Sequence, residues 1–375
     1  MATQALQKKL GFIASLVAPL LEFRITGLDI SDVSMKYLSF DSTKKNKIIV
    51  SAYGEIVYPA GIITNGEVKD EEKLTDILKQ WLAKEKKKLP LPFVVLSLPE
   101  EKSFIRAAQI PRVKSEDVAN AVRWEIENQI PLPFEEIIYD YEVIKSPDDN
   151  QDHIDVIITA FPRNILNAYI RAVKGAGLEP YAIELESQSV VRACLPQLNS
   201  SEATIVADIG RTRTSFVIFA QGSILHTSTI EMGGSMFEQY IIKQLSIGTK
   251  EAAQIKINIG LDKSQRNGEV FTALAPAITI IGDELTRAIS YYRTHATHAH
   301  GATPQIERIL LSGGDANLRG LDTYLTNVLK ISVQRADPFS VINEKLAYSI
   351  PPLTKQEALA FTTAIGLALR EIRQN

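Results

Sequence analysis

The chain has 375 residues, of which 45% are hydrophobic, so it is long enough to bury a sizeable core and to form two domains. A formal net charge of −3 provides no basic field for non-specific nucleic-acid binding. Cys194 is the single cysteine, which excludes an intramolecular disulfide framework and suits a reducing cytoplasm.

Residues 1–24 form an apolar arm, in which Lys8 and Lys9 precede the apolar run Leu10–Leu21. The run is similar to the apolar part of a signal peptide, but Glu22-Phe23-Arg24 stands where a cleavage site needs small residues. It is also shorter than the about 20 apolar residues that span a bilayer. We therefore expect an arm that docks on this protein, on a partner or on a membrane.

The first part of the chain alternates in the pattern of strands. We expect a strand, a turn and a strand over Ile25–Leu38, more sheet at 48–50 and 55–58, and a helix over Asp70–Lys88. Residues 89–182 mix strands (93–98, 104–110, 139–144, 154–160) with helices (115–130, 163–174). This mixture predicts an inserted subdomain.

The second part repeats the strand–turn–strand pattern over 204–220 and adds a strand at 224–231. Helices follow at 236–245, 250–258 and 270–293, then a strand at 308–311, a helix to about 329 and a terminal helix over 354–374. His295, His298 and His300 crowd one short stretch. Histidines that bind a metal can be spaced in this way, but we favour the interpretation that they belong to a polar loop before Gly301.

Both strand–turn–strand elements carry an aspartate before the turn, at Asp29 and Asp208, and two glycine pairs follow at Gly233-Gly234 and Gly313-Gly314. Each feature alone is an ordinary turn. In this order, two hairpins can hold a phosphate chain, and the aspartates can hold Mg²⁺ through its waters. The glycines would let a base and a ribose approach the backbone.

This order resembles the actin-like ATPase superfamily. Gly27–Ile30 resembles its first phosphate motif, Ala207–Thr214 the second, and Leu311–Ala316 the adenosine motif. The resemblance implies an α/β, actin-like (ribonuclease H-like) two-domain ATPase fold with a small α+β inserted subdomain. The expected division is a first domain of 25–88 and 183–205 with the C-terminal helix 354–375, an inserted partner-binding subdomain of 89–182, and a second domain of 206–353 that includes a subdomain at about 246–305.

ATP and Mg²⁺ are the cofactors that this resemblance implies. Asp29 and Asp208 are the expected metal residues, and Glu186 stands in the segment where the family carries a water-positioning residue. Glu184, Gln188, or a helix-end glutamate without chemistry are the alternatives for that role. The expected nucleotide-binding residues are Ser34, Lys36, Gly210, Arg211, Thr212, Thr214, Gly233, Gly234, Lys256, Gly313, Gly314 and Asp315.

A second resemblance rests on Ala121–Pro131, Tyr139-Asp140-Tyr141, Gly177–Pro180 and Gly282–Tyr292. These runs closely resemble the PilM family of type IV pilus assembly. The resemblance implies a cytoplasmic, ATP-binding adaptor, peripheral at the inner membrane, that recruits the N-terminal tail of a PilN-like membrane protein. That tail would lie in a groove between the inserted subdomain and the first domain. Pilus motor ATPases and homo-oligomers are further implied partners.

Two segments depart from the actin-like pattern. Ser31 and Asp32 stand where the first phosphate turn usually has glycine and then serine or threonine, and Ala253 stands where a glutamate precedes Lys256. Arg211 and Arg213 would offset Asp32 by pairing with it or with phosphate. These departures imply that the protein is at most a slow ATPase, or that it is a scaffold that binds no nucleotide.

Three alternatives to the adaptor follow from the same resemblances. They are an active ATPase that polymerises, a small-molecule kinase of the same fold, and the related component of type II secretion. A kinase needs a general base near its acceptor, and no aspartate or histidine here has that context. A chaperone would need a separate peptide-binding domain, for which the residues after the nucleotide domain leave no room.

Overall fold

The computed structural model describes residues 25–42, 48–85, 92–144, 152–197, 202–295, 305–342, 351–370 and 372. The apolar arm predicted at 1–24, and His298 and His300 of the histidine-rich stretch, lie outside these residues. In the part that is described, no helix is long and apolar enough to cross a membrane.

The first domain is built on a five-stranded sheet with the order β10-β6-β1-β2-β3. Strands β1, β2 and β3 are antiparallel, whereas β6 and β10 run parallel to β1. Apolar side chains of α2 and α4 pack with one face of this sheet, and α11 packs on the other. The elements are β1 (Thr26–Ile30), β2 (Ser34–Ser42), β3 (Ile48–Val57), β4 (Ile63–Thr64), β5 (Glu67–Val68), α2 (Glu71–Glu85), β6 (Phe93–Leu98), α4 (Arg163–Gly175), β10 (Glu179–Leu185) and α5 (Glu186–Cys194).

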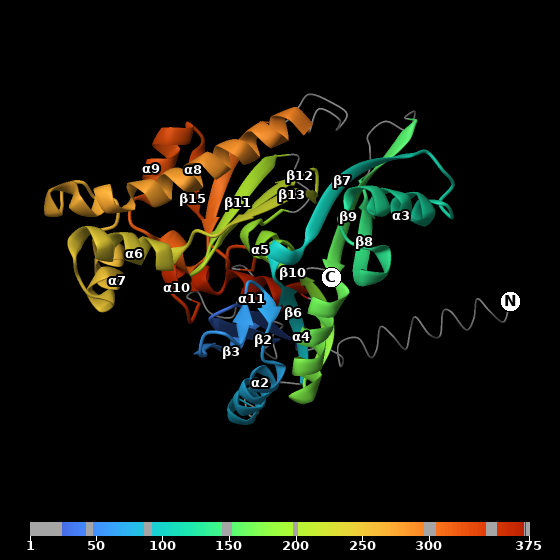
Figure 1. Cartoon of the computed structure of the whole chain (residues 1–375), viewed down its shortest axis with the longest axis horizontal. Coiled ribbons are helices and arrows are strands. Elements are labelled where there is room, and N and C mark those ends of the chain that lie inside the picture. The colour runs from blue at the N-terminus through green and yellow to red at the C-terminus, as the bar shows by residue number, and fades with distance from the viewer. Residues whose placement is uncertain are drawn as a thin grey trace.

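The second domain repeats this topology in a five-stranded sheet with the order β13-β12-β11-β14-β15. Its central strand β11 pairs antiparallel with β12 and parallel with β14, as β1 does with β2 and β6. Figure 1 shows the long helix α8 crossing this domain. The elements are β11 (Ala203–Ile209), β12 (Thr214–Ala220), β13 (Ser223–Ile230), α6 (Gly234–Leu245), α7 (Thr249–Asn258), η3 (Arg266–Gly268), α8 (Glu269–His295), β14 (Ile306–Ser312), η5 (Gly314–Asn317), α9 (Leu321–Leu329) and β15 (Ser332–Arg335).

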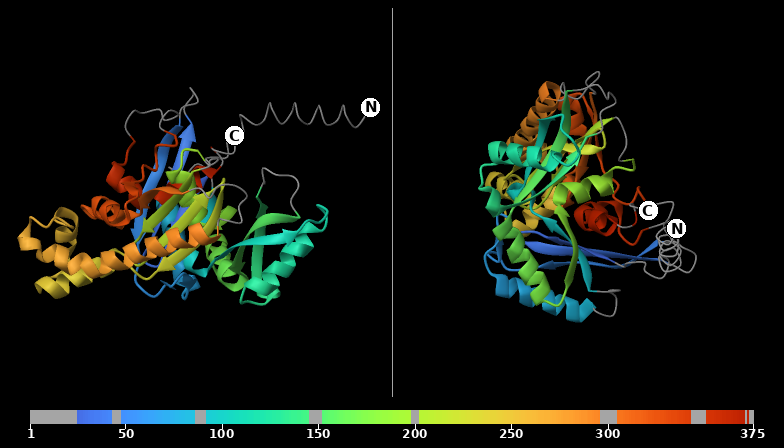
Figure 2. Two further views of the ribbon diagram at one scale, coloured as in Figure 1. Left: turned by 90° about the horizontal axis from the view of Figure 1, so that it is seen from above. Right: turned by 90° about the vertical axis from the view of Figure 1, so that its right-hand side faces the viewer.

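A third unit is a three-stranded sheet, β7-β9-β8, with helix α3 packed on one face. The views of Figure 2 show it beside the two domains. It is narrower than the predicted 89–182, because β6 and β10 form hydrogen bonds within the first sheet and α4 packs there with α2. The elements are η1 (Glu100–Lys102), β7 (Phe104–Pro111), α3 (Val118–Gln129), η2 (Phe134–Glu136), β8 (Ile137–Val143) and β9 (His153–Pro162).

Two other element predictions need correction. The strand predicted in two pieces at 48–50 and 55–58 is one strand, β3, because it pairs with β2 along its whole length. The single helix predicted over 354–374 is two helices, α10 (Lys355–Ala360) and α11 (Thr362–Ala368), separated at Phe361. The break lets α10 contact η5 of the second domain while α11 packs on β1 and α5 of the first.

Candidate functional site

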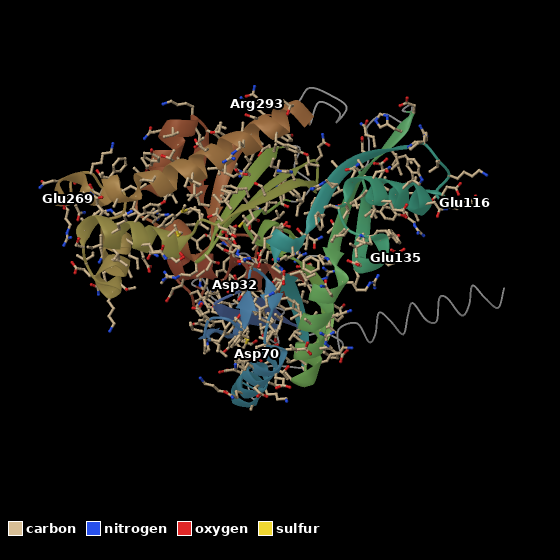
Figure 3. All side chains as sticks on the ribbon, viewed as in Figure 1. Asp32, Asp70, Glu116, Glu135, Glu269 and Arg293 are labelled. Atoms are coloured by element: carbon tan, nitrogen blue, oxygen red, sulfur yellow. The ribbon has the colours of Figure 1, made fainter. Side chains whose placement is uncertain are left out.

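A cavity of about 370 Å³, called the cleft below, lies where the two β-hairpins face each other. The turn between β1 and β2 lines one side, and residues 210–213, between β11 and β12, line the other. Figure 3 shows Asp32, from the first turn, near the middle of the molecule where the two domains meet. The central strand of each sheet, β1 or β11, ends at the turn of its own hairpin. The repeated topology therefore brings the two turns together at the cleft.

Three of the predicted carboxylates, Asp29, Glu186 and Asp208, line the cleft together. Burial raises the pKa of Asp208 to about 6 and also raises the pKa of Asp29, whose Oδ1 accepts a hydrogen bond of 3.0 Å from Ser97 Oγ. Burial, and then the charges of the two aspartates, raise the pKa of Glu186 well above its usual value. Such a cluster favours a cation, which would stabilise all three charged forms.

The structure allows a test of whether these residues fit Mg²⁺. Within the described ranges, no group of three or more acidic, histidine or cysteine side chains is placed to ligate a metal directly. Magnesium keeps several of its waters in proteins and needs only one or two carboxylates. Asp29 and Asp208 therefore fit a hydrated ion and not a fully ligated one.

Ser34 and Lys36 are both engaged by Glu55, a residue that sequence reasoning missed. Ser34 Oγ donates a hydrogen bond of 2.7 Å to Glu55 Oε1, and Lys36 Nζ lies 3.3 Å from the same oxygen. Lys36 and Glu55 are direct neighbours across β2 and β3. The register of this hairpin, had it been predicted, would have indicated their pairing. All three residues line the cleft, so an anion bound there would meet Lys36 together with the carboxylate of Glu55.

The second turn places Gly210, Arg211 and Thr212 against the cleft, as predicted. Thr214 does not belong to the described lining of the cleft, because its side chain is fully buried and its hydroxyl donates a hydrogen bond of 2.6 Å to the carbonyl of Met232. Ser215 lines the cleft instead. Successive residues of a strand point to opposite faces, and the sequence alone did not show which face would reach the cleft.

The expected nucleoside end contains a chain of ion pairs. Arg211 donates to both oxygens of Glu238 at 2.6 and 2.7 Å, and Lys256 Nζ lies 2.8 Å from Glu238 Oε1 and 2.5 Å from Asp315 Oδ1. Two predicted nucleotide residues, Arg211 and Lys256, thus pair with Glu238, which was not predicted, and Lys256 also pairs with the third, Asp315.

The glycine turns are packed tightly against the rest of the protein. A Cβ on Gly313, whose φ is +85°, would lie 2.3 Å from the carbonyl oxygen of Ile209. A Cβ on Gly234 would lie 2.0 Å from the carboxylate of Asp315, and one on Gly233 2.5 Å from the carbonyl of Gly210. Gly313, Gly314 and Asp315 line the cleft, whereas Gly233, Gly234 and Lys256 do not belong to its described lining. Internal packing alone accounts for these glycines.

Arg213 connects the two sides of the cleft. Its guanidinium forms ion pairs with Asp32, from the opposite hairpin turn, and with Glu101 of η1. Asp32 also accepts hydrogen bonds from the backbone N–H groups of Asn65 (3.1 Å) and Gly66 (3.0 Å). The pairing of Arg213 with Asp32 was one of the two predicted arrangements, and the contact with Glu101 was not foreseen.

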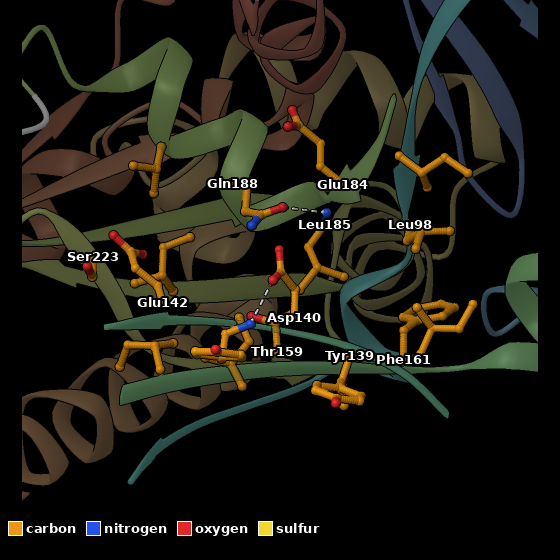
Figure 4. A pocket seen from close by; sticks show the side chains of 18 of the residues that line it. Leu98, Tyr139, Asp140, Glu142, Thr159, Phe161, Glu184, Leu185, Gln188 and Ser223 are labelled. Atoms are coloured by element: carbon orange, nitrogen blue, oxygen red, sulfur yellow. Dashed lines mark hydrogen bonds between the residues drawn. The ribbon is translucent and has the colours of Figure 1, made fainter. Parts of the chain in front are cut away.

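A second cavity of about 690 Å³, called the groove below, lies between the inserted subdomain, the first domain and the β12–β13 hairpin. Figure 4 shows Asp140 and Glu142 of β8 projecting into it opposite Gln188 of α5. Its apolar lining comes from Ile105, Ile138, Ile157, Phe161, Leu166, Ile183, Leu185, Val191, Phe219 and Ile224.

Two domains of the same sheet topology, joined at a hairpin-lined cleft, define an actin-like protein, and comparison with known proteins agrees. The chain belongs to the family described as "Type IV pilus assembly protein PilM", whose sequence profile matches residues 27–372. It is similar to the solved "PilM-PilN type IV pilus biogenesis complex" (23% identity, TM-score 0.75, covering 93% of this chain and 98% of that one). A structure of MreB5 of Spiroplasma citri bound to ADP has the same fold (14% identity, TM-score 0.57, covering 94% and 97%).

Curated relatives match only part of the chain. The cell shape-determining protein Mbl of Bacillus cereus is 25% identical over 212 residues, which is 48% of this chain and 63% of Mbl. The cell division protein FtsA of Bacillus subtilis is 25% identical over 199 residues, or 47% of this chain and 43% of FtsA. The chain thus matches less than two thirds of the length of either relative.

Proposed function

We propose that this protein is an adaptor of type IV pilus assembly that works at the cytoplasmic face of the inner membrane and binds the N-terminal tail of a PilN-like membrane protein in the groove. The family membership and the similarity to a solved PilM–PilN complex support the proposal. The observation that carries it is the groove itself, because it is large and apolar and is lined by all three units of the chain.

The groove suits an extended peptide. One wall is the face of the inserted sheet that is not covered by α3. Residues 138–142 of β8 all line the groove, but Tyr139 and Tyr141 also pack into the core beneath α3, whereas Asp140 and Glu142 project into the groove (Figure 4). An extended chain presents alternate side chains to such a wall, so apolar residues at every second position would fill it.

Charge in the groove favours a basic tail. Asp140 and Glu142 form no ion pair with any described cation, whereas the buried Glu184 is held by both Arg192 and Arg370. The charges of Arg192 and Arg370 are therefore balanced by Glu184, whereas Asp140 and Glu142 have no counter-charge among the described residues. We expect the bound tail to combine apolar residues with lysine or arginine.

Titration calorimetry with a synthetic peptide of the PilN-like tail tests this. The pair of changes Asp140→Asn and Glu142→Gln should weaken binding about 3- to 10-fold, and added salt should weaken the wild type more than the variant, as expected for one or two exposed charge pairs. Glu116→Gln with Glu135→Gln is the matched control, since it removes two exposed charges of the same subdomain outside the groove. Absence of peptide binding to the wild type would refute the proposed function.

We also propose that the cleft binds ATP with hydrated Mg²⁺, with hydrolysis slow at most. Asp29 and Asp208 would hold the ion through waters, and Lys36 with the N–H groups of the turn at Gly210 would bind phosphate. The ion would supply the positive charge that the three carboxylates lack. The ion pairs of Lys256 with Glu238 and Asp315 must rearrange if the nucleoside is to use these side chains.

Two measurements test the cleft without reference to the peptide. Calorimetric titration of ATP–Mg²⁺ should show binding, and Glu186→Gln should lower phosphate release while binding persists, because Glu186 would act on water and not on the nucleotide. Phosphate release that is unchanged in Glu186→Gln would leave no role for this residue. A titration without heat and without thermal stabilisation would favour the nucleotide-free scaffold.

A further inference from the structure

The cleft and the groove share a thin wall. Leu98 lines the groove and its neighbour Pro99 lines the cleft, and Leu185 lines the groove while Glu186 lines the cleft. The two wall segments are joined by a hydrogen bond of 3.1 Å from the N–H of Ser187 to Glu100 Oε2. The same two segments therefore line both the cleft and the groove.

Arg213 holds this wall from the opposite domain. It reaches from the β11–β12 turn to Glu101, which lies in η1 between the groove residues Leu98 and Ile105. The side chains of Arg213 and Glu101 are 19% and 17% exposed, so a loss of this pairing would leave a largely buried carboxylate without a counter-charge. The same guanidinium pairs with Asp32, which is 13% exposed.

The position of Arg213 in the cleft makes these pairs sensitive to anions. Arg213 and Asp32 both line the cleft. A guanidinium binds phosphate through two N–H groups at once, so a phosphate beside Arg213 competes with both carboxylates. The phosphate also repels Asp32 and Glu101, which favours their separation from Arg213.

We infer that Arg213, Asp32 and Glu101 form a latch that couples the two cavities: a phosphate group bound in the cleft takes Arg213 from Asp32 and Glu101, releases η1, and weakens peptide binding in the groove. This inference rests on the function proposed above for the cleft and the groove. Because coupling between two ligands is reciprocal, the bound peptide weakens phosphate binding by the same factor.

Hydrogen exchange of the free protein tests the latch without either ligand. In Arg213→Gln the amides of residues 99–105 should exchange at least about fivefold faster than in the wild type, because η1 loses its tie to the second domain. Glu101→Gln removes the same tie from the other side and should give the same result. Arg266→Gln is the control, since it removes an exposed arginine that pairs with Glu251, away from the cleft. Exchange that is unchanged in both latch variants, with native circular dichroism, overturns the inference.

Peptide affinity with and without ATP–Mg²⁺ tests the coupling. In the wild type the nucleotide should raise the Kd of the synthetic PilN-like tail at least about fivefold, the lower end of usual allosteric coupling. In Arg213→Gln the Kd should be raised already and should not respond to the nucleotide. If both ligands bind the wild type independently, or Arg213→Gln still responds, the latch is refuted. If the wild type binds neither ligand, the proposed function fails, and hydrogen exchange still decides whether the latch exists.

Discussion

A desolvated carboxylate keeps its proton to a higher pH than the same group in the unfolded chain, and Asp208 is such a group, because desolvation outweighs the opposing effects of Ser312 and Lys36. Its pKa is about 6 in the folded protein and 3.8 in the unfolded reference. Between these values the native state binds more protons than the unfolded state, so the contribution of Asp208 to stability is lost as the pH rises from about 4 to about 6.

Asp208→Asn should therefore stabilise the ligand-free protein at pH 7.5 by about 3 kcal/mol, as the pKa difference implies. Equilibrium denaturation at several pH values measures this effect, which should disappear near pH 4. Mg²⁺ should stabilise the wild type above pH 6 and much less below it, because protons then compete for Asp208. Asp262→Asn is the contrasting variant: hydrogen bonds from Ser264 and Gln265 lower the pKa of this exposed carboxyl, so its removal should destabilise. A less stable Asp208→Asn would contradict the interpretation.

At the scale of elements, α11 depends on the absence of a side chain at one position. A Cβ on Gly366 would lie 1.9 Å from the carbonyl oxygen of Ser189 in α5, so the two helices approach through their backbones. Neighbouring side chains cannot relieve this contact, since backbone of α5 is what the new atom would meet.

Gly366→Ala should thus lower the free energy of unfolding by about 3 kcal/mol or more, in the upper range for overpacked cores. Gly282→Ala is the matched control, because the nearest atom to its added Cβ is Leu325 Cδ2 at 3.9 Å. Within α8 that change should stabilise by up to about 1 kcal/mol through helix propensity. Urea denaturation compares the two variants, and equal effects would show that the close approach of α5 and α11 is not what requires glycine.

At the scale of the whole molecule, the C-terminal segment joins the two domains. Helix α11 packs on β1 and α5 of the first domain, and α10 contacts η5 of the second. Arg370, just beyond α11, pairs with the buried Glu184 of β10. The segment belongs to the core of the first domain and also bridges to the second.

A chain that stops at residue 353 should consequently fail to unfold cooperatively, because the apolar face of the first sheet around Leu38 and Val95 would lose its cover. Calorimetric scanning tests this, with a chain that stops at residue 372 as the control. A sharp transition in the shorter chain would show that α10 and α11 are dispensable for the fold.

Local patterns in the chain were enough to predict most elements and the family. Alternation and helical spacing placed most strands and helices, and the repeated aspartate-containing hairpins with two glycine pairs indicated the actin-like fold, which the structure and the comparisons confirm. The runs around Ala121–Pro131 indicated the pilus assembly family, which the family match confirms. These features depend on the order and spacing of residues that lie close together in the chain.

Contacts between residues that are distant in the chain could not be predicted, because they depend on how the sheets and domains pack. An apolar strand does not specify its neighbours, so β6 and β10 were assigned to the inserted subdomain although they pair within the first sheet. Thr214 was expected in the cleft, but strand pairing turns Ser215 to that side. Glu101 lies 112 positions before Arg213 (213 − 101), and their contact exists only because the β11–β12 turn of the second domain packs against η1. Local periodicity carries no information about such partners, since they are chosen by the packing of the domains.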